Sequence, residues 1–424
     1  MWDDRGILSE SNAIEDRPLL SALTDNGWNP VGGASFYRPV VFWSHRADLA
    51  LWGRSPAGHH FTNALAFALV TYGLARLLFA LTPSLWGVLA GLLYWLIHPA
   101  HGEVVDWISG RSDLLAAAGG MAFLALAWPR DASAARLALA FAALALGLLG
   151  KEVAIAFPVA LIAAALPDRR HAGKLAGLTG LLLAVYLLMR SRCAGLAHGY
   201  PFGPPASLQE FALVQAVNLR LLGRYLAMLV TGRDYGLLAF SEMITERRNV
   251  AGGVDGLLQH ELDLEVALAG IAVLALIPAA IRLWRGSPAD RLGLVLIVLP
   301  LLLSMNLGTA RQQINFSDRY AFVPTIGVAL ILSQRVSGWV VLALLIAIGP
   351  WMRLGVEHRQ RYASEVGFWE LAVQKNPGSL HAWHMRGLTL LNIGERSEGI
   401  AALRAAWSLG HDPQTRAVLD RVAN

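Results

Sequence analysis

The chain has 424 residues, of which 55% are hydrophobic and only 15% are charged, whereas soluble domains carry about 25% charged residues. The apolar residues gather in long blocks, so the composition excludes an ordinary soluble protein and indicates several membrane spans. The net charge of +5 lies mainly in short connections between the blocks, which fits the positive-inside rule better than nucleic-acid binding, and the one cysteine, Cys193, excludes an intrachain disulfide and a cysteine-based metal site.

The apolar blocks predict an all-α fold, a polytopic membrane helical bundle of about ten spans. These are residues 61–81, 84–98, 112–128, 137–149, 152–166, 175–189, 266–281, 292–305, 321–333 and 337–352. Several are shorter than the roughly 20 residues that a full crossing needs, so some helices are expected to be tilted or broken. We expect an outer-face segment at 1–60, a transmembrane domain at 61–353 and a C-terminal segment at 364–424.

The run 137–166 can be one long helix or a hairpin that turns at Lys151 and Glu152. Basic residues flank it on both sides: Arg130 and Arg136 before it, and Arg169, Arg170 and Lys174 after it. If both groups are cytoplasmic, the chain must cross twice between them, and this favours the hairpin.

With this hairpin, the basic groups at 130–136, 169–174, 282–291 and Arg335 all fall on the cytoplasmic side. The segments 1–60, 99–111, 150–153, 190–263, 306–320 and the tail after 353 then fall on the outer side, the periplasm if the membrane is a bacterial inner membrane. The stretch 207–232 of the long outer loop is amphipathic and could lie on the membrane surface.

Residues 364–424 are polar and helical in pattern. Trp369 and Ala372 recur 34 residues later as Leu403 and Ala406, with Gly387 between them, and this spacing resembles the tetratricopeptide repeat. Fewer than the three repeats of a stable solenoid are present, so the segment is expected to dock on the membrane domain or on a partner protein, or to serve only as a helical cap.

Polar residues gather in the segments predicted on the outer face. They are Asp3, Asp4, Arg38, His59, His60, Asn63, His98, His101, Glu103, Arg111, Asp113, Lys151, Glu152, Asn315, Asp318, Arg319 and Tyr320. Taken singly, each has a simpler interpretation: a solvated terminus, a wetted hairpin tip, or an interfacial histidine. Together they offer cations for a lipid phosphate and carboxylates that can take a proton from a hydroxyl.

These segments resemble a known family. The stretches Trp2-Asp3-Asp4, Tyr37-Arg38-Pro39, 59–63, 98–103, 110–113, 149–152 and 318–320, followed by the repeat segment, are similar in kind and order to the transmembrane and tetratricopeptide-repeat (TMTC) O-mannosyltransferases and their bacterial relatives, of the GT-C glycosyltransferase class.

The resemblance implies an inverting transfer from a polyprenyl-phosphate sugar donor to an acceptor hydroxyl, on a protein or a glycan, at the outer face. It implies Asp3 as general base with Asp4 as its neighbour. Arg38, Arg111, Lys151 and Arg319 would hold the donor phosphate, and His59, His60, His98, His101, Glu103, Asp113 and Glu152 would shape the pocket. It also implies a first transmembrane helix before the acidic pair, where this chain begins two residues before Asp3, and a longer repeat region, as in animal members.

Two other functions remain open: a non-catalytic membrane scaffold that recruits partners through 364–424, and a transporter or flippase, which the gathering of polar residues at one face disfavours. We predict no cofactor. His98 and His101 have a spacing that can bind a divalent metal, but no partnered motif accompanies them.

Overall fold

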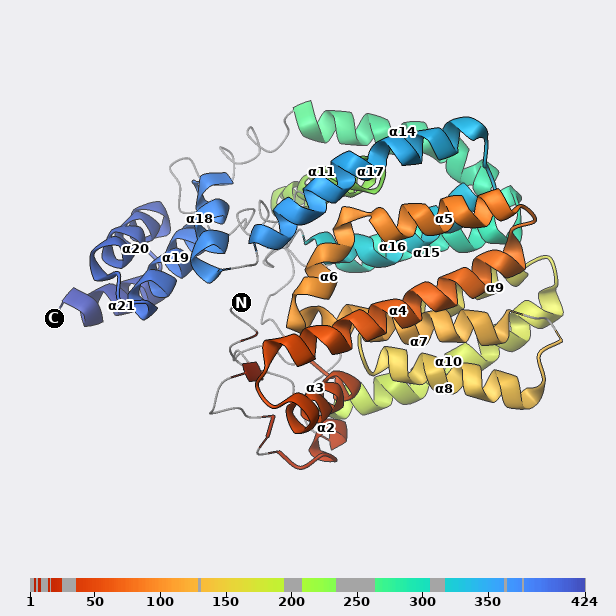
Figure 1. Ribbon diagram of the computed structural model, residues 1–424, viewed down its shortest axis with the longest axis horizontal. Helices are drawn as coiled ribbons and strands as arrows, with labels where there is room; N and C mark the ends of the chain where they lie inside the picture. The colour runs from red at the N-terminus through yellow and green to blue at the C-terminus, as the bar shows by residue number, and fades with distance from the viewer. Residues whose placement is uncertain are drawn as a thin grey trace. The chain divides into compact units, whose positions relative to one another are not determined.

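The computed structural model describes residues 4, 7–8, 14–15, 17–24, 36–128, 131–193, 208–233, 264–305, 317–361, 364–375 and 377–423. Asp3, Arg130 and Asn315 lie outside them. The described residues form helices and turns, with no β-strand among them, so the all-α prediction is confirmed (Figure 1).

Each predicted apolar segment falls on a helix. The helices are α4 (Pro56–Leu81), α5 (Leu85–Ile97), α7 (Arg111–Ala127), α8 (Ala134–Leu148), α9 (Ala156–Ala165), α10 (Arg169–Cys193), α14 (Leu264–Arg285), α15 (Pro288–Ser304), α16 (Phe322–Ser333) and α17 (Gly338–Arg361). Among the described residues, four helices are long and apolar enough to cross a membrane: α4, α10, residues 264–284 of α14 and residues 338–357 of α17. That all ten segments cross stays a prediction.

The run 137–166 is divided as the hairpin interpretation requires. Helix α8 ends at Leu148, and the short 3-10 helix η3 (Glu152–Ile155) leads into α9. Lys151 separates them in an extended backbone conformation. The alternative of one continuous helix is therefore wrong.

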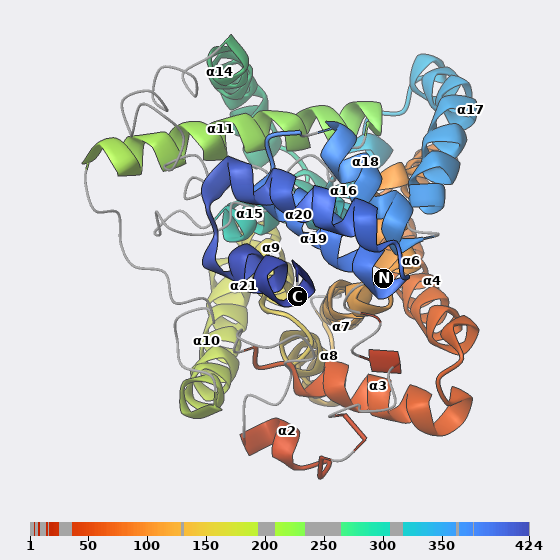
Figure 2. The same ribbon diagram turned by 90° about the vertical axis from the view of Figure 1, so that its left-hand side faces the viewer.

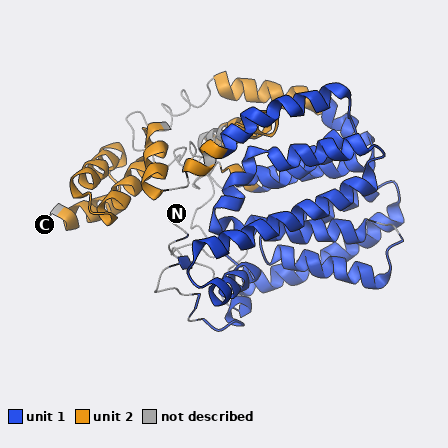
Figure 3. Cartoon of the chain, in the orientation of Figure 1, with its two compact units in different colours: residues 1–200, 278–303, 319–355 blue, residues 201–277, 304–318, 356–424 orange. Residues whose placement is uncertain are grey.

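The chain divides into two compact units, which we describe separately (Figure 3). Unit 1 comprises residues 1–200, 278–303 and 319–355, and unit 2 comprises residues 201–277, 304–318 and 356–424. The domain boundaries expected from the sequence near residues 60 and 353–364 stay predictions.

In unit 1 the apolar helices run alongside one another, and α3 (Pro39–Trp52) lies across them, as the two views show (Figures 1 and 2). Small residues let these helices approach closely. A Cβ atom added to Gly119 of α7 would lie 2.6 Å from the carbonyl oxygen of Ala143 and 2.7 Å from the Cα of Gly147, both on α8. The backbones are thus in contact, which dispersion forces favour where lipid offers no hydrophobic drive.

Short elements lie at the end of unit 1 where α3 lies. One is α2 (Ser21–Thr24), and three others, η1 (Pro99–His101), α6 (Gly102–Asp106) and η2 (Ile108–Gly110), connect α5 to α7. Gly110 is required at the end of η2, because a Cβ there would lie 2.6 Å from the carbonyl oxygen of Val104. The tight turn lies in the polar segment 98–113, which contacts helices α3 and α4.

Unit 2 contains α11 (Leu208–Thr231), which occupies the stretch predicted as amphipathic. Arg224 of α11 forms a bidentate pair with Glu265, at the start of α14, over 2.7 and 2.9 Å. The Tyr225 hydroxyl donates to the carbonyl oxygen of Ser317 over 3.2 Å. A place on the membrane surface stays a prediction for this helix.

The C-terminal part of unit 2 consists of α18 (Glu365–Lys375), α19 (Leu380–Asn392), α20 (Arg396–Gly410) and α21 (Pro413–Ala423). The residues that recur 34 positions apart, Trp369 with Leu403 and Ala372 with Ala406, are all buried. Helices α19 and α20 touch at glycines, since a Cβ on Gly387 would lie 3.0 Å from the carbonyl oxygen of Gly399. The two helix backbones are therefore in close contact at these glycines, whereas membership of the tetratricopeptide class stays a prediction.

Candidate active site

Asp4 is held beside the 107–111 turn of unit 1. Its side chain is buried, and its Oδ1 accepts a hydrogen bond from the backbone N–H of Ser109 over 3.3 Å. Its charge also acts on Arg111. Asp4 therefore lies against a part of the chain that was predicted from the sequence to be on the same face.

Arg111 is fully buried and connects helices α3 and α4. Its Nη1 lies 2.5 Å from Oδ2 of Asp48 on α3, and its Nε donates to Oδ1 of Asn63 on α4 over 2.8 Å. Its Nη2 donates to the carbonyl oxygen of His59 over 2.8 Å. Asn63 in turn donates to the carbonyl oxygens of Val105 and Trp107. All three guanidinium nitrogens are thus engaged with the protein, unlike those of a cation presented to a ligand.

Lys151 and Asp113 form a second pair. The Lys151 ammonium donates to both carboxylate oxygens of Asp113, over 2.7 and 2.8 Å, and lies 5.2 Å from the centre of the Tyr320 ring. The lysine side chain remains 14% exposed while the aspartate is 4% exposed. Of the two charged groups, the lysine is therefore the more accessible from outside the protein.

Arg319 forms a third group with Glu103 and two aromatic rings. Its backbone N–H donates to Oε2 of Glu103 over 3.1 Å, and its guanidinium lies 4.7 Å from the centre of the Trp107 ring and 5.4 Å from that of Tyr320. Burial by itself would lower the pKa of the Arg319 guanidinium, but the acidic groups of Tyr320, Glu103 and Asp113 raise it above its usual value. The group stays charged.

Arg38 and Glu152 meet at the start of α3. The backbone N–H of Val40 donates to the carbonyl oxygen of Leu149 over 3.3 Å, which brings the α3 start to the α8–η3 turn. The Arg38 guanidinium stacks 4.3 Å from the centre of the Phe36 ring, and its charge acts on Glu152. Glu152 pairs with Arg190.

His98 and His101 are both buried in the core, His101 between α5 and α16 and His98 between Tyr94 of α5 and Trp351 of α17. The His101 ring centre lies 4.2 Å from that of Trp95 and 5.4 Å from that of Phe322, and its Nε2 lies 3.1 Å from Oγ1 of Thr325. Burial, with the nearby His98, lowers the pKa of His101 well below its usual value, so the ring is neutral. His60 lies apart from them on α4 and is partly exposed.

The structure therefore brings together Asp4, Arg38, Glu103, Arg111, Asp113, Lys151, Glu152 and Arg319 at one end of unit 1. Three further residues at this end, Asp48 and His45 on α3 and Arg190 on α10, were not among those predicted from the sequence. Each is an ionisable residue in or at the end of an apolar helix, and such residues are costly unless paired or functional. That signal was available for all three.

Comparison with known proteins gives partial matches to one group. The chain is 33% identical over 119 residues to the protein O-mannosyl-transferase Tmtc1 of Drosophila melanogaster, and 31% identical over 117 residues to TMTC2 of Mus musculus. It is 30% identical over 119 residues to human TMTC2. These matches cover 26–27% of this chain and only 14% of each relative, so the chain spans a small part of the length of the curated relatives it matches.

No family model matches the chain, and no solved structure matches it. A stretch of about a quarter of the chain is thus similar to TMTC O-mannosyltransferases.

Proposed function

We propose that this chain is a membrane glycosyltransferase of the inverting GT-C type. It transfers a sugar, mannose by analogy with the names of its relatives, from a polyprenyl-phosphate donor to a hydroxyl of a protein or glycan acceptor. The observation that carries the proposal is the gathering of cations from separate segments at one end of unit 1, next to the turn that holds Asp4.

The charges suit a lipid-carried sugar phosphate. Arg38, Lys151, Arg190 and Arg319 lie with Glu103, Asp113 and Glu152, and these seven groups have one positive charge in excess. Arg111 with Asp48 and Asp4, on the side of the 107–111 turn, adds one negative charge. A sugar phosphodiester carries one negative charge, and charge-assisted hydrogen bonds to phosphate are the strong ones. We assign Arg38, Lys151 and Arg319 to the donor phosphate. Arg111 instead positions the site, because its nitrogens are engaged with Asp48, Asn63 and the backbone.

The reaction is a single displacement. The acceptor hydroxyl oxygen attacks the anomeric carbon of the sugar as the bond from that carbon to the phosphate oxygen breaks, so the configuration inverts. The hydroxyl proton passes to a carboxylate, and polyprenyl phosphate leaves with a second negative charge. The three cations stabilise that developing charge in the transition state more than in the ground state, which is what accelerates the step.

Asp3 is the general base of this proposal, and it lies outside the described residues. Asp4 beside it is buried and accepts from the Ser109 N–H, and these contacts suit a residue that fixes the acidic segment. In this proposal Glu103, Asp113 and Glu152 supply the negative charges of the surroundings. His59, His98 and His101 shape them as buried side chains, and His60 is partly exposed on α4.

The site is proposed on the non-cytoplasmic face of the membrane, the periplasmic face if the membrane is a bacterial inner membrane. Arg169 and Arg190 stand at opposite ends of α10. At 1.5 Å per residue they are roughly 32 Å apart, about the thickness of the hydrocarbon core. Arg190 pairs with Glu152 at the site, so the basic Arg169 end falls on the side that the positive-inside rule makes cytoplasmic. The segment 364–424 would then offer an outer surface to the acceptor or a partner protein.

The test measures transfer of labelled mannose from polyprenyl-phosphate mannose, in membranes that contain the protein expressed from the full open reading frame. Asp3→Asn is compared with wild type and with Asp131→Asn, which removes an exposed carboxylate between α7 and α8. Loss of a general base costs roughly 10²–10⁴-fold in rate. We expect that loss in Asp3→Asn only, at equal amounts of inserted protein.

Equal rates in Asp3→Asn and wild type would remove Asp3 from the mechanism. No transfer by wild type with mannose, glucose and N-acetylglucosamine donors would refute the enzyme proposal and favour the scaffold.

A further inference from the structure

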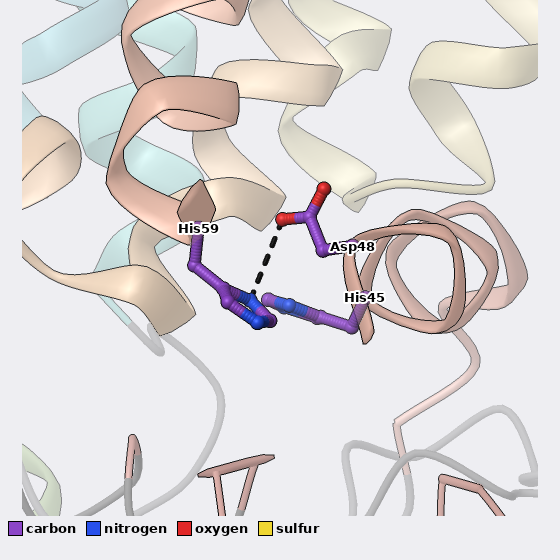
Figure 4. Close-up of side chains that lie close together, drawn as sticks. All are labelled: His45, Asp48 and His59. Atoms are coloured by element: carbon purple, nitrogen blue, oxygen red, sulfur yellow. Dashed lines mark ion pairs between the residues drawn. The ribbon is translucent and has the colours of Figure 1, made fainter. Parts of the chain in front are cut away.

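A cluster of three buried side chains joins α3 to α4. His45 and Asp48 lie one turn apart on α3, and His59 lies near the start of α4 (Figure 4). Their exposed fractions are 0%, 2% and 0%. One potential ligand atom from each lies within 4.8 Å of the others, and the two histidine rings stack with their centres 6.2 Å apart.

Hydrogen bonding fixes which nitrogen of His59 carries a proton. Its Nε2 lies 3.1 Å from the carbonyl oxygen of Gly53, which only accepts, so Nε2 is the donor. The other ring nitrogen, Nδ1, lies 3.4 Å from Oδ2 of Asp48. A neutral His59 would then present a lone pair to a carboxylate oxygen. A proton, carried either by the ring or by the Asp48 carboxyl, or a metal ion between these two atoms would remove that repulsion.

We propose that His45, Asp48 and His59 bind one divalent transition-metal ion of the zinc class. The ligands are Nδ1 of His59, Oδ2 of Asp48 and a ring nitrogen of His45. Two imidazoles and one carboxylate form a ligand set that zinc and its neighbours bind at about 2.0–2.2 Å, with a fourth position open. These ligand atoms lie within 4.8 Å of one another, so the side chains would have to close on the ion to reach those bond lengths.

The surroundings are those of a metal site. Metal-ligating histidines almost always donate their other N–H to a carbonyl or carboxylate, as His59 does to Gly53. The other carboxylate oxygen of Asp48 accepts from the Thr62 hydroxyl over 2.7 Å, which fixes its orientation. Arg111 also contacts Oδ2, and its positive charge weakens cation binding. The charge of Asp4, which acts on Arg111, offsets part of that effect.

An ion here would cross-link α3 and α4 beneath the turn that holds Asp4. This structural role does not rest on the proposed transfer reaction. None of the three ligands was assigned to the donor phosphate or to proton transfer.

The experiment uses the full chain purified in detergent with an affinity tag free of histidine. Zinc is measured by elemental mass spectrometry, and Co²⁺ is added to chelator-treated protein to record its visible d–d absorption. Wild type is expected to hold about one zinc per chain. His45→Ala and His59→Ala are expected to lose it, and Thr62→Val is expected to bind roughly 10–100-fold more weakly, as outer-shell changes do.

His60→Ala is the matched control, because His60 adjoins His59 in the sequence and is not part of the cluster. It should retain the zinc of wild type. Should a ligand variant fail to fold, wild type alone decides. Chelation should lower its melting temperature, and added Zn²⁺ should restore it.

Wild type that binds neither ion and melts unchanged would overturn the proposal. So would a His59 ring that nitrogen NMR shows to be doubly protonated at pH 8 in zinc-supplemented protein, because a proton would then occupy the position assigned to the metal. Full zinc content in both His45→Ala and His59→Ala would overturn it as well.

Discussion

Arg111→Met tests whether Arg111 is an internal anchor or a ligand of the donor phosphate. The guanidinium contacts Asp48, Asn63 and the carbonyl of His59, and its exposed fraction is 0%. Methionine fills much of the same space but leaves Asp48 charged and buried without its partner. Breaking a buried ion pair in this way costs about 3–5 kcal/mol.

That cost predicts a large fall in melting temperature. For a unit of about 150–250 residues, 1 kcal/mol shifts the melting temperature by roughly 2–4 °C, so we expect a fall of roughly 6–20 °C. The 14 tryptophans provide the fluorescence signal in detergent, and chelator is present so that no ion compensates Asp48. The double variant Arg111→Met/Asp48→Asn should regain part of the loss, with a coupling energy of about 0.5–3 kcal/mol.

Arg54→Met is the matched control. Arg54 pairs with Glu15 over 2.6 Å, but its side chain is 40% exposed, and such surface pairs contribute about 0–1 kcal/mol. The reasoning fails if Arg111→Met melts no lower than Arg54→Met, or if the double variant loses as much stability as the two single changes added together. If Arg111→Met has the melting temperature of wild type but a raised KM for the donor, Arg111 would instead be assigned to the donor phosphate.

Three further predictions address the donor site, the helix packing and the C-terminal segment. In the Asp113→Asn background, Lys151→Met should lower kcat/KM for the donor roughly 10–100-fold, which corresponds to one charged hydrogen bond of about 1.5–3 kcal/mol. The exposed control Lys174→Met should leave kcat/KM unchanged. Equal kcat/KM values in the two variants would mean that Lys151 is only a solvated residue at the hairpin tip. Gly293→Ala should destabilise by about 1–3 kcal/mol in a thermal melt, since its Cβ would lie 2.6 Å from the Gly327 carbonyl oxygen; a variant as stable as wild type would show that α15 and α16 can separate freely. Burial, with the nearby His384, holds the pKa of His381 at about 4, so between pH 6.5 and 4 the unfolded segment binds a proton that the folded one does not. The folded segment therefore loses stability as pH falls, by at most about 3 kcal/mol. The opening equilibrium of residues 365–423, followed by hydrogen exchange, should rise at pH 5 in wild type and not in His381→Gln, and an equal rise in both would contradict the prediction.

The apolar blocks and the placement of charges predicted the positions of the helices and of the hairpin break without tertiary information. Each predicted span lies on a helix, and the hairpin break at Lys151 was deduced from the basic residues on either side of it. Both inferences work because lipid imposes local rules: backbone groups must bond within their own helix, and basic connections stay on one side. The 34-residue recurrence pairs Trp369 with Leu403, and the structure buries both of them in the C-terminal helices.

The contacts of the individual polar residues could be read only from the folded chain. Arg111 and Lys151 are both cations at one end of unit 1, yet one is enclosed by Asp48 and Asn63 and the other remains partly exposed beside Asp113. His98 and His101 have the spacing of a metal pair but pack among aromatic rings, whereas His45, Asp48 and His59 converge from two helices. Spacing along one helix determines which residues share its face, but burial and partners depend on neighbouring helices that are distant in sequence.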